Sequence, residues 1–172
     1  MQIIYKLGDM KDIKQYIIES TQFEDLHEEI KHYVDGILVN KDSDEILLLQ
    51  RAGYIKPFGG KWGFVGGSID KNDKSPKDAL IREIKEETGI KLSFNEERSM
   101  KPFGKQEHMG GTNDEEVVSD TEYFVIEMET KPEVKLSREH SRYKWFDKES
   151  IKEKQGKCVP DVFHYIQKYY DE

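Results

Sequence analysis

The chain has 172 residues, of which 35% are hydrophobic and 36% charged, and its formal net charge at pH 7 is -8. This length suits one domain with a short extension. The acidic balance disfavours nucleic acid as the main partner, because phosphate backbones are bound by basic surfaces. The single cysteine, Cys158, excludes an internal disulfide and a cysteine-based zinc site. With no apolar run of about 18 residues and no signal-peptide pattern at the start, we expect a cytoplasmic protein that does not enter a membrane.

We expect two parts, an N-terminal extension over 1–32 and a main domain over 33–172. The extension contains a charged, helix-like segment with apolar residues, and we expect it to cover substrate or a partner subunit. In the main domain, apolar residues at 34–39 and 46–49 flank a polar turn, which is the pattern of a β-hairpin. A glycine-rich stretch follows at 53–67.

The clearest local signal predicts a helix over 76–88. Ser75 is a suitable N-cap, Pro76 suits the first helical position, and Asp78 completes a capping box. Gly89 stands where a helix commonly ends in the left-handed conformation.

Beyond this helix, the pattern predicts strands over 99–103, 121–128 and 143–146, with a polar loop over 108–119. After Pro160, apolar residues at helical spacing predict a last helix that lays one face on a core. Strands followed by one central and one final helix indicate the α/β class, a mixed β-sheet covered by helices.

The central helix carries three carboxylates on one face, from Glu83, Glu86 and Glu87. The neighbouring face holds the apolar residues, so the acids lie beside the core and not opposite it. Like charges at this spacing destabilise a helix by a few tenths of a kcal/mol per pair, and a divalent cation would neutralise them. Oxygen-only ligands favour magnesium or manganese over zinc. The alternative is a simple solvated acidic face.

The residues around this helix resemble a known family motif. The segment 67–90, GSIDKNDKSPKDALIREIKEETGI, resembles the Nudix box, G-x5-E-x7-R-E-U-x-E-E-x-G-U, where U is a bulky aliphatic residue. Every specified position from Arg82 to Ile90 matches, and the preceding GKWGFVGG at 60–67 is similar to the lead-in of many members. Weaker similarity at 47–51 and 139–145 extends the resemblance over about residues 33–170.

The first half of the motif departs from the family pattern. Counting forward from Gly67 places Asp73 where the early glutamate belongs, whereas counting back from Arg82 places Lys74 there. The loop therefore has one extra residue, and we expect Asp73 to be the substitute.

The resemblance implies a Nudix-type α/β/α sandwich and a MutT-like hydrolase that cleaves a nucleoside diphosphate linked to another moiety. It implies Mg²⁺, with Mn²⁺ as the alternative, held by Glu83, Glu86, Glu87 and the carbonyl of Gly67. Glu83 and Glu86 are then the catalytic carboxylates, with Glu83 the first choice for the base that takes a proton from water.

The resemblance also suggests substrate-binding roles for Arg51 and Glu127, with the loop acids at 114–116 as a second source of a late base. Arg82 is expected to anchor the helix carboxylates, although Asp78 is an equally spaced partner. We expect a small nucleotide as the partner, neither membrane nor nucleic acid, and a homodimer stays open.

Three hypotheses compete at this point. The leading one is a magnesium-dependent pyrophosphohydrolase acting on a nucleoside triphosphate, a nucleotide sugar or an ADP-ribose type of substrate. The second is a non-catalytic, nucleotide-sensing module of the same fold; the altered loop favours it and the intact carboxylates oppose it. The third, an unrelated α/β protein with a solvated acidic helix, is opposed by the complete match from Arg82 to Ile90.

Overall fold

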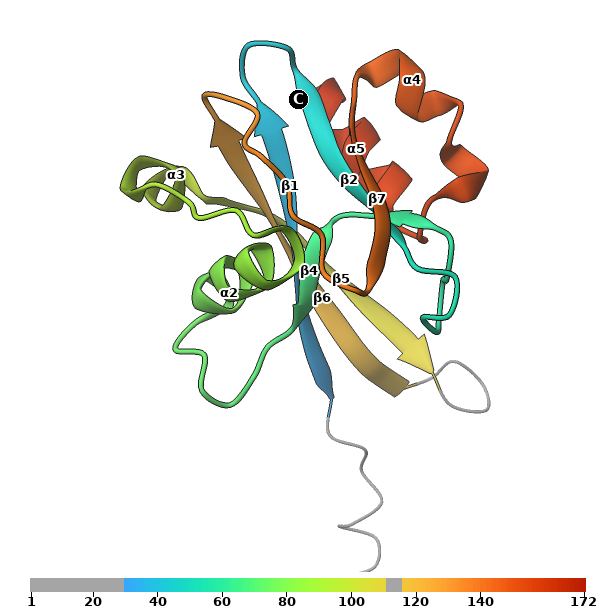
Figure 1. Ribbon diagram of the computed structural model, residues 1–172. Helices are drawn as coiled ribbons and strands as arrows, with labels where there is room; N and C mark the ends of the chain where they lie inside the picture. The colour runs from blue at the N-terminus through green and yellow to red at the C-terminus, as the bar shows by residue number, and fades with distance from the viewer. Residues whose placement is uncertain (1–29, 111–115) are drawn as a thin grey trace, which may run out of the picture. The chain divides into compact units, whose positions relative to one another are not determined.

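Residues 30–110 and 116–172 are described here from a computed structural model (Figure 1). Most of the predicted extension, and the loop acids Asp114 and Glu115, lie outside these residues. Among the helices described, none combines the length and apolar character needed to cross a membrane.

The described residues form one mixed sheet of seven strands. Its strands are β1 (Lys31–Asn40), β2 (Glu45–Arg51), β3 (Trp62–Gly63), β4 (Val65–Ser68), β5 (Lys101–Gly110), β6 (Glu116–Met128) and β7 (His140–Phe146). The order is β3-β2-β1-β6-β5, with β4 also paired to β1 and β7 to β2. The predicted hairpin is therefore present as β1 and β2, which pair antiparallel.

β1 is the strand that positions the site. Along one edge it pairs in parallel with β6, and along the other it pairs antiparallel with β4 and then β2. Because β4 leads into the central helix, the first half of β1 pairs directly with Gly66 and Gly67, the glycines of β4 that precede that helix.

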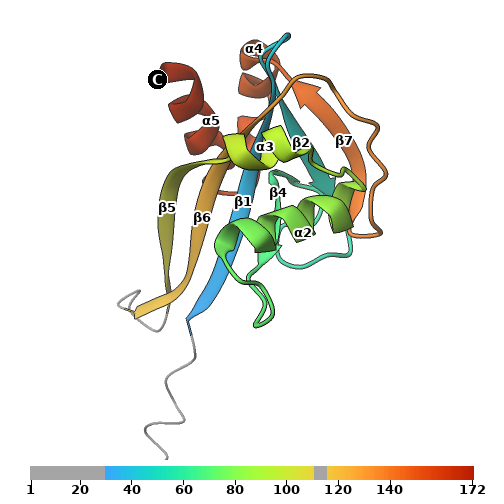
Figure 2. The same ribbon diagram turned by 90° about the vertical axis from the view of Figure 1, so that its left-hand side faces the viewer.

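Helices cover both faces of the sheet, as Figures 1 and 2 show. They are α2 (Pro76–Thr88), α3 (Phe94–Ser99), α4 (Lys148–Lys152) and α5 (Val162–Asp171), with a short 3-10 turn at Gln155–Lys157. Because side chains alternate along a strand, β2 directs Leu47 and Leu49 into the core under α2, and Ile46 and Leu48 into the core under α5. The predicted mixed α/β sandwich is confirmed.

Two local predictions need correction. The predicted loop over 108–119 is partly strand, because β5 and β6 stay paired as far as Gly110 and Glu116. This ribbon carries polar residues such as His108 and Ser119, so it lacks the apolar alternation by which strands are recognised. The short helix α3 was not predicted because it buries none of its residues, although its capping box of Ser93 and Glu96 is present in the sequence.

Candidate active site

Local capping fixes helix α2 at both predicted ends. The Ser75 hydroxyl accepts a hydrogen bond from the Asp78 N–H at 3.2 Å, and Pro76 occupies the first turn. Gly89 has φ 69° and donates its N–H to the Lys85 carbonyl, which closes the last turn in a conformation that favours glycine. The predicted range 76–88 is confirmed.

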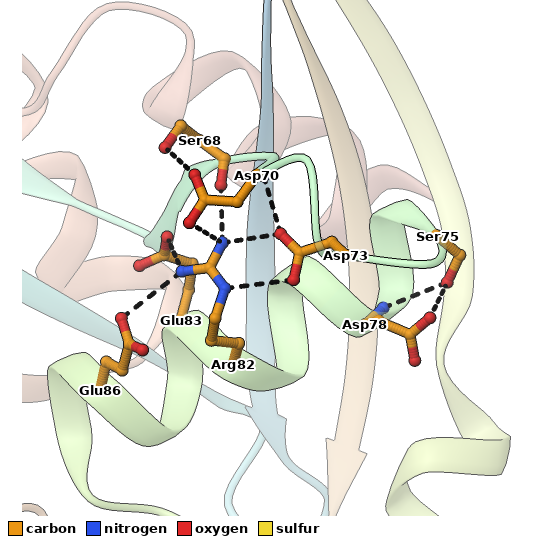
Figure 3. Close-up of polar contacts among 8 residues, drawn as sticks. All are labelled: Ser68, Asp70, Asp73, Ser75, Asp78, Arg82, Glu83 and Glu86. Carbon is orange, nitrogen blue, oxygen red and sulfur yellow. Dashed lines mark hydrogen bonds and ion pairs between the residues drawn. The ribbon is translucent and has the colours of Figure 1, made fainter.

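Arg82 gathers the acidic groups of this region (Figure 3). Its guanidinium donates to both oxygens of Asp73, at 3.2 and 2.9 Å, and to Glu83 Oε1 at 2.7 Å. A longer bond of 3.4 Å reaches Glu86, and the Ser68 carbonyl accepts at 2.9 Å. Arg82 thus ties the loop before α2 to the helix.

Asp78, the other candidate partner of Arg82, instead accepts a hydrogen bond from the Ser75 hydroxyl at 2.8 Å (Figure 3). The hydrogen bonds from Arg82 and from the Asp70 N–H hold the pKa of Asp73 below its ordinary value. Asp73 is therefore the nearest acidic partner that the loop, one residue longer than the motif, supplies to Arg82. Asp70 of the same loop forms a longer ion pair at 3.7 Å.

The three helix carboxylates differ in exposure. The Glu87 residue is only 7% exposed, and its Oε2 accepts a hydrogen bond from the Gly66 N–H at 3.0 Å. Burial raises the pKa of Glu87 to about 8 and also raises the pKa of Glu83. Glu86 is the open one, with a side chain 61% exposed. Two of these carboxylates are held where their negative charge is disfavoured unless a cation is near.

Gly67 lies against the Glu83 carboxylate. A Cβ at position 67 would come within 2.5 Å of the Glu83 carboxyl carbon. A side chain at position 67 would therefore displace the Glu83 carboxylate, and the glycine backbone approaches that carboxylate directly.

These groups line a cavity of about 410 Å³. Its lining residues are Tyr33, Asp35, Arg51, Gly66, Gly67, Ser68, Glu83, Glu86, Glu87, Thr121 and Glu139. Four of them, Tyr33, Asp35, Arg51 and Thr121, also line a second cavity of about 550 Å³. The cavity at the helix carboxylates therefore adjoins the larger second cavity, and these four residues lie where the two meet.

Arg51, a predicted substrate-binding residue, lies where the two cavities meet. Its Nε is buried and, among the described residues, has no hydrogen-bond partner. A buried guanidinium nitrogen without a partner costs free energy unless a ligand or water completes it.

Glu127, the other predicted substrate-binding residue, is not brought to this site. It pairs with Val39 near the far end of β1, whereas the site lies at the Tyr33–Asp35 end. Glu127 instead lines a separate cavity of about 200 Å³ with Lys41 and Glu129. The sequence indicated the strand correctly, but the placement depended on the parallel register of β1 and β6, which the sequence alone does not give.

Three further residues at the site were not predicted: Asp35, Glu139 and His140. Asp35 and Glu139 line the carboxylate cavity, and burial raises the pKa of Asp35 to about 7. The Nε2 atom of His140 lies 3.6 Å from Glu87 Oε1. In β1, Asp35 stands between Val34 and Gly36, which are both buried. An acidic residue inside this otherwise apolar segment is the signal by which the sequence could have indicated Asp35.

The donor set fits a hard divalent cation, because it consists of carboxylate oxygens beside the two glycines of β4, whose backbone is not covered by side chains of their own. Within 30–110 and 116–172, no three acidic, histidine or cysteine side chains are already placed to hold a metal ion together. Glu83 and Glu86 are paired with Arg82 instead. A cation would therefore have to compete with Arg82 for these two carboxylates.

A family model described as NUDIX domain matches residues 30–165. The chain belongs to the Nudix family. The predicted resemblance, and with it the assignment to the Nudix hydrolase family, is confirmed. None of the curated proteins compared with the chain matches it significantly.

Solved structures share the fold. A bifunctional NMN adenylyltransferase/ADP ribose pyrophosphatase from Francisella tularensis is 19% identical, with a TM-score of 0.68 over 92% of this chain and 46% of that one. This Nudix chain thus spans about half of that protein. The NUDIX domain of Shewanella oneidensis NrtR, complexed with ADP ribose, is 18% identical, with a TM-score of 0.65 over 96% of this chain and 98% of that one. A MutT protein from Methanosarcina mazei Go1 is 26% identical, with a TM-score of 0.58 over 85% and 96% of the two chains.

Proposed function

We propose that this Nudix hydrolase cleaves a pyrophosphate bond in a nucleoside diphosphate linked to another moiety, with Mg²⁺ or Mn²⁺ bound at the carboxylate face. The observation that carries the proposal is a cavity lined by Gly67 and three helix carboxylates, two of them with raised pKa values. Arg51 lines the same cavity, and its buried Nε has no hydrogen-bond partner among the described residues. An anionic substrate and a divalent cation would each neutralise one part of this charge pattern.

Glu83, Glu86 and Glu87 would hold the metal, together with the carbonyl of Gly67. A bound divalent cation would neutralise phosphate oxygens and lower the pKa of a water molecule. Arg51 would bind a phosphate of the substrate, since a guanidinium matches phosphate oxygens in charge and shape. Glu83 would take the proton from the attacking water, because the burial that raises its pKa makes it a better proton acceptor.

The second cavity would hold the moiety attached to the phosphates. Tyr33, Phe58 and Tyr123 offer aromatic surface there, and about 550 Å³ is a size that suits a small ligand. Asp161 also lines this cavity; it has φ 71° and makes no side-chain cap to α5. Its carboxylate would accept hydrogen bonds from N–H or O–H groups of the substrate.

A substrate panel tests the proposal. Nucleoside triphosphates, nucleotide sugars, ADP-ribose and dinucleoside polyphosphates would be incubated with the full chain and Mg²⁺, and the nucleotide products identified. We expect hydrolysis of at least one class, lost on removal of the divalent ion and in Glu86→Gln. The matched control is Glu153→Gln, which changes an exposed glutamate at the C-cap of helix α4. This variant should keep activity.

The panel also separates the alternative function. Tight nucleotide binding without any product would favour the non-catalytic sensing module and contradict hydrolysis. Hydrolysis that persists in the presence of excess chelator would contradict the metal-dependent mechanism.

A further inference from the structure

The segment that leads into β7 is fastened to the end of helix α2. The Lys135 N–H donates to the Thr88 carbonyl at 2.7 Å, and the Ser137 N–H donates to the Glu87 carbonyl at 3.0 Å. Further along, the Glu139 carbonyl accepts a hydrogen bond from the Ala52 N–H at 2.7 Å. Backbone bonds on both sides therefore fix the next residue, His140, against the helix that carries the carboxylates.

His140 is buried beside Glu87. Its side chain is 3% exposed, and its Nε2 lies 3.6 Å from Glu87 Oε1, slightly beyond hydrogen-bond distance. The other carboxylate oxygen of Glu87 accepts the Gly66 N–H at 3.0 Å. Glu87 thus has the Gly66 N–H of strand β4 on one oxygen and the imidazole next to the other.

The surroundings select one form of the ring. The His140 ring is buried, and because a buried charged imidazolium is costly, the geometry favours the neutral ring with one N–H. Nδ1 is buried and, in the part of the chain described, has no hydrogen-bond partner. A buried N–H without an acceptor is costly, so the proton belongs on Nε2, which faces the carboxylate.

The same form suits the neighbouring strand. His140 and Arg51 are paired residues of β7 and β2, and the buried Arg51 Nε–H also has no partner among the described residues. With the proton on Nε2, Nδ1 is an acceptor on the same rung of the β2–β7 ladder as that donor.

We propose that His140 is a positioning residue, whose Nε2–H holds the Glu87 carboxylate in the orientation in which it binds the metal. The inference rests on the proposed function, because it concerns a carboxylate that the proposed function assigns to the metal. Partners of this kind, which orient a ligand without touching the metal, change metal affinity by about 10- to 100-fold when they are lost.

Three substitutions test this role. Glutamine places an amide N–H at about the position of Nε2, asparagine places one at about the position of Nδ1, and phenylalanine fills the ring volume without a donor. Mn²⁺ binding to the full chain would be titrated by calorimetry, which needs no turnover, and thermal unfolding in chelator would report folding. His164→Phe, at an exposed position of α5, is the matched control.

We expect His140→Asn and His140→Phe to weaken Mn²⁺ binding by at least about tenfold, while His140→Gln and His164→Phe stay within about threefold of the parent. In a substrate assay, kcat at limiting metal should fall with little change in substrate KM. If His140→Phe does not fold, the comparison of glutamine with asparagine decides the matter.

Equal Mn²⁺ affinity in the parent and all folded variants, or equal loss for glutamine and asparagine, would overturn the role of His140 and leave the proposed function standing. A parent chain that binds no Mn²⁺ would overturn both.

Discussion

At the scale of single residues, Glu87 shows a conflict between stability and function. Its carboxylate is almost fully buried, and burial raises its pKa to about 8 in the metal-free protein. Because the folded-state pKa lies above the ordinary value, folding is favoured at low pH, and this contribution is lost as the pH rises toward 8. A cation would remove the conflict, and such strain is typical of functional sites.

Glu87→Gln should therefore stabilise the metal-free protein and abolish turnover. The amide oxygen can still accept the Gly66 N–H, while the buried charge is gone. We expect a gain of about 1 kcal/mol in the free energy of unfolding, in chelator near neutral pH. Thermal and denaturant unfolding measure it, with Glu153→Gln as the control. A variant that is less stable than the parent would show that the charge is already well compensated.

Gly67→Ala should damage the site without changing any functional group. The added methyl group would meet the Glu83 carboxylate, which is held by Arg82 and cannot move away freely. We expect a loss of turnover of at least about tenfold, since small displacements at a reacting centre are costly. Gly53→Ala, where a Cβ meets nothing within 4 Å, is the control. Full activity in Gly67→Ala would mean that the close approach of the Gly67 backbone to Glu83 is not part of the site.

At the scale of elements, the loop before α2 and the helix act as one unit through Arg82. Asp73 binds two of the guanidinium nitrogens, and Glu83 and Glu86 share another. The loop thus supplies Arg82 with a carboxylate from outside the helix, so the guanidinium is shared between the loop and the helix carboxylates. The one-residue-longer loop with aspartate in place of glutamate still delivers a carboxylate to Arg82.

Asp73→Asn should therefore raise the Mg²⁺ concentration needed for half-maximal turnover. Without the Asp73 charge, Arg82 would pair more strongly with Glu83 and Glu86 and compete with the metal. We expect an increase of several-fold, with near-normal turnover at saturating Mg²⁺ and recovery in Asp73→Glu, which keeps the charge. A variant with unchanged Mg²⁺ dependence would indicate that Asp73 only closes the loop.

The elements also show which features the sequence could predict. Helix α2 was predictable at both ends because Ser75, Pro76 and Gly89 act within one turn of the helix. The face shared by the three glutamates follows from helix periodicity alone. His140 and Glu139 were not predictable as site residues, because the segment that carries them is fastened to α2 by backbone bonds between residues about 50 apart in the sequence. Glu127 lies outside the carboxylate cavity because of the parallel register of β1 and β6, which the sequence alone does not give.

At the scale of the whole molecule, two β-strands from one hairpin and one crossover helix bring acidic and basic groups to a single cavity. β1 supplies Asp35, β2 supplies Arg51, and α2 supplies the three glutamates. The raised pKa values of Asp35, Glu83 and Glu87 have burial as their first cause. Proton binding and metal binding are thus coupled across the site.

Metal affinity should therefore rise with pH. Below about pH 8 a proton competes with the metal for Glu87, so raising the pH from about 6 to about 8 should strengthen Mn²⁺ binding by up to about tenfold per unit, and the gain should level off above that. Calorimetric titrations at constant ionic strength measure this dependence. An affinity that does not vary over this range would contradict the raised pKa of Glu87.

The central claim is that the glutamates of α2 bind a divalent cation for pyrophosphate hydrolysis. The most direct test is the rate of product formation against Mg²⁺ concentration, on the best substrate of the panel, for the parent, Glu83→Gln, Glu86→Gln, Glu87→Gln and the control Glu153→Gln. The account predicts saturable Mg²⁺ dependence in the parent and control, and rates at least about 100-fold lower in the three α2 variants. Near-parental rates and Mg²⁺ dependence in all three α2 variants would contradict it.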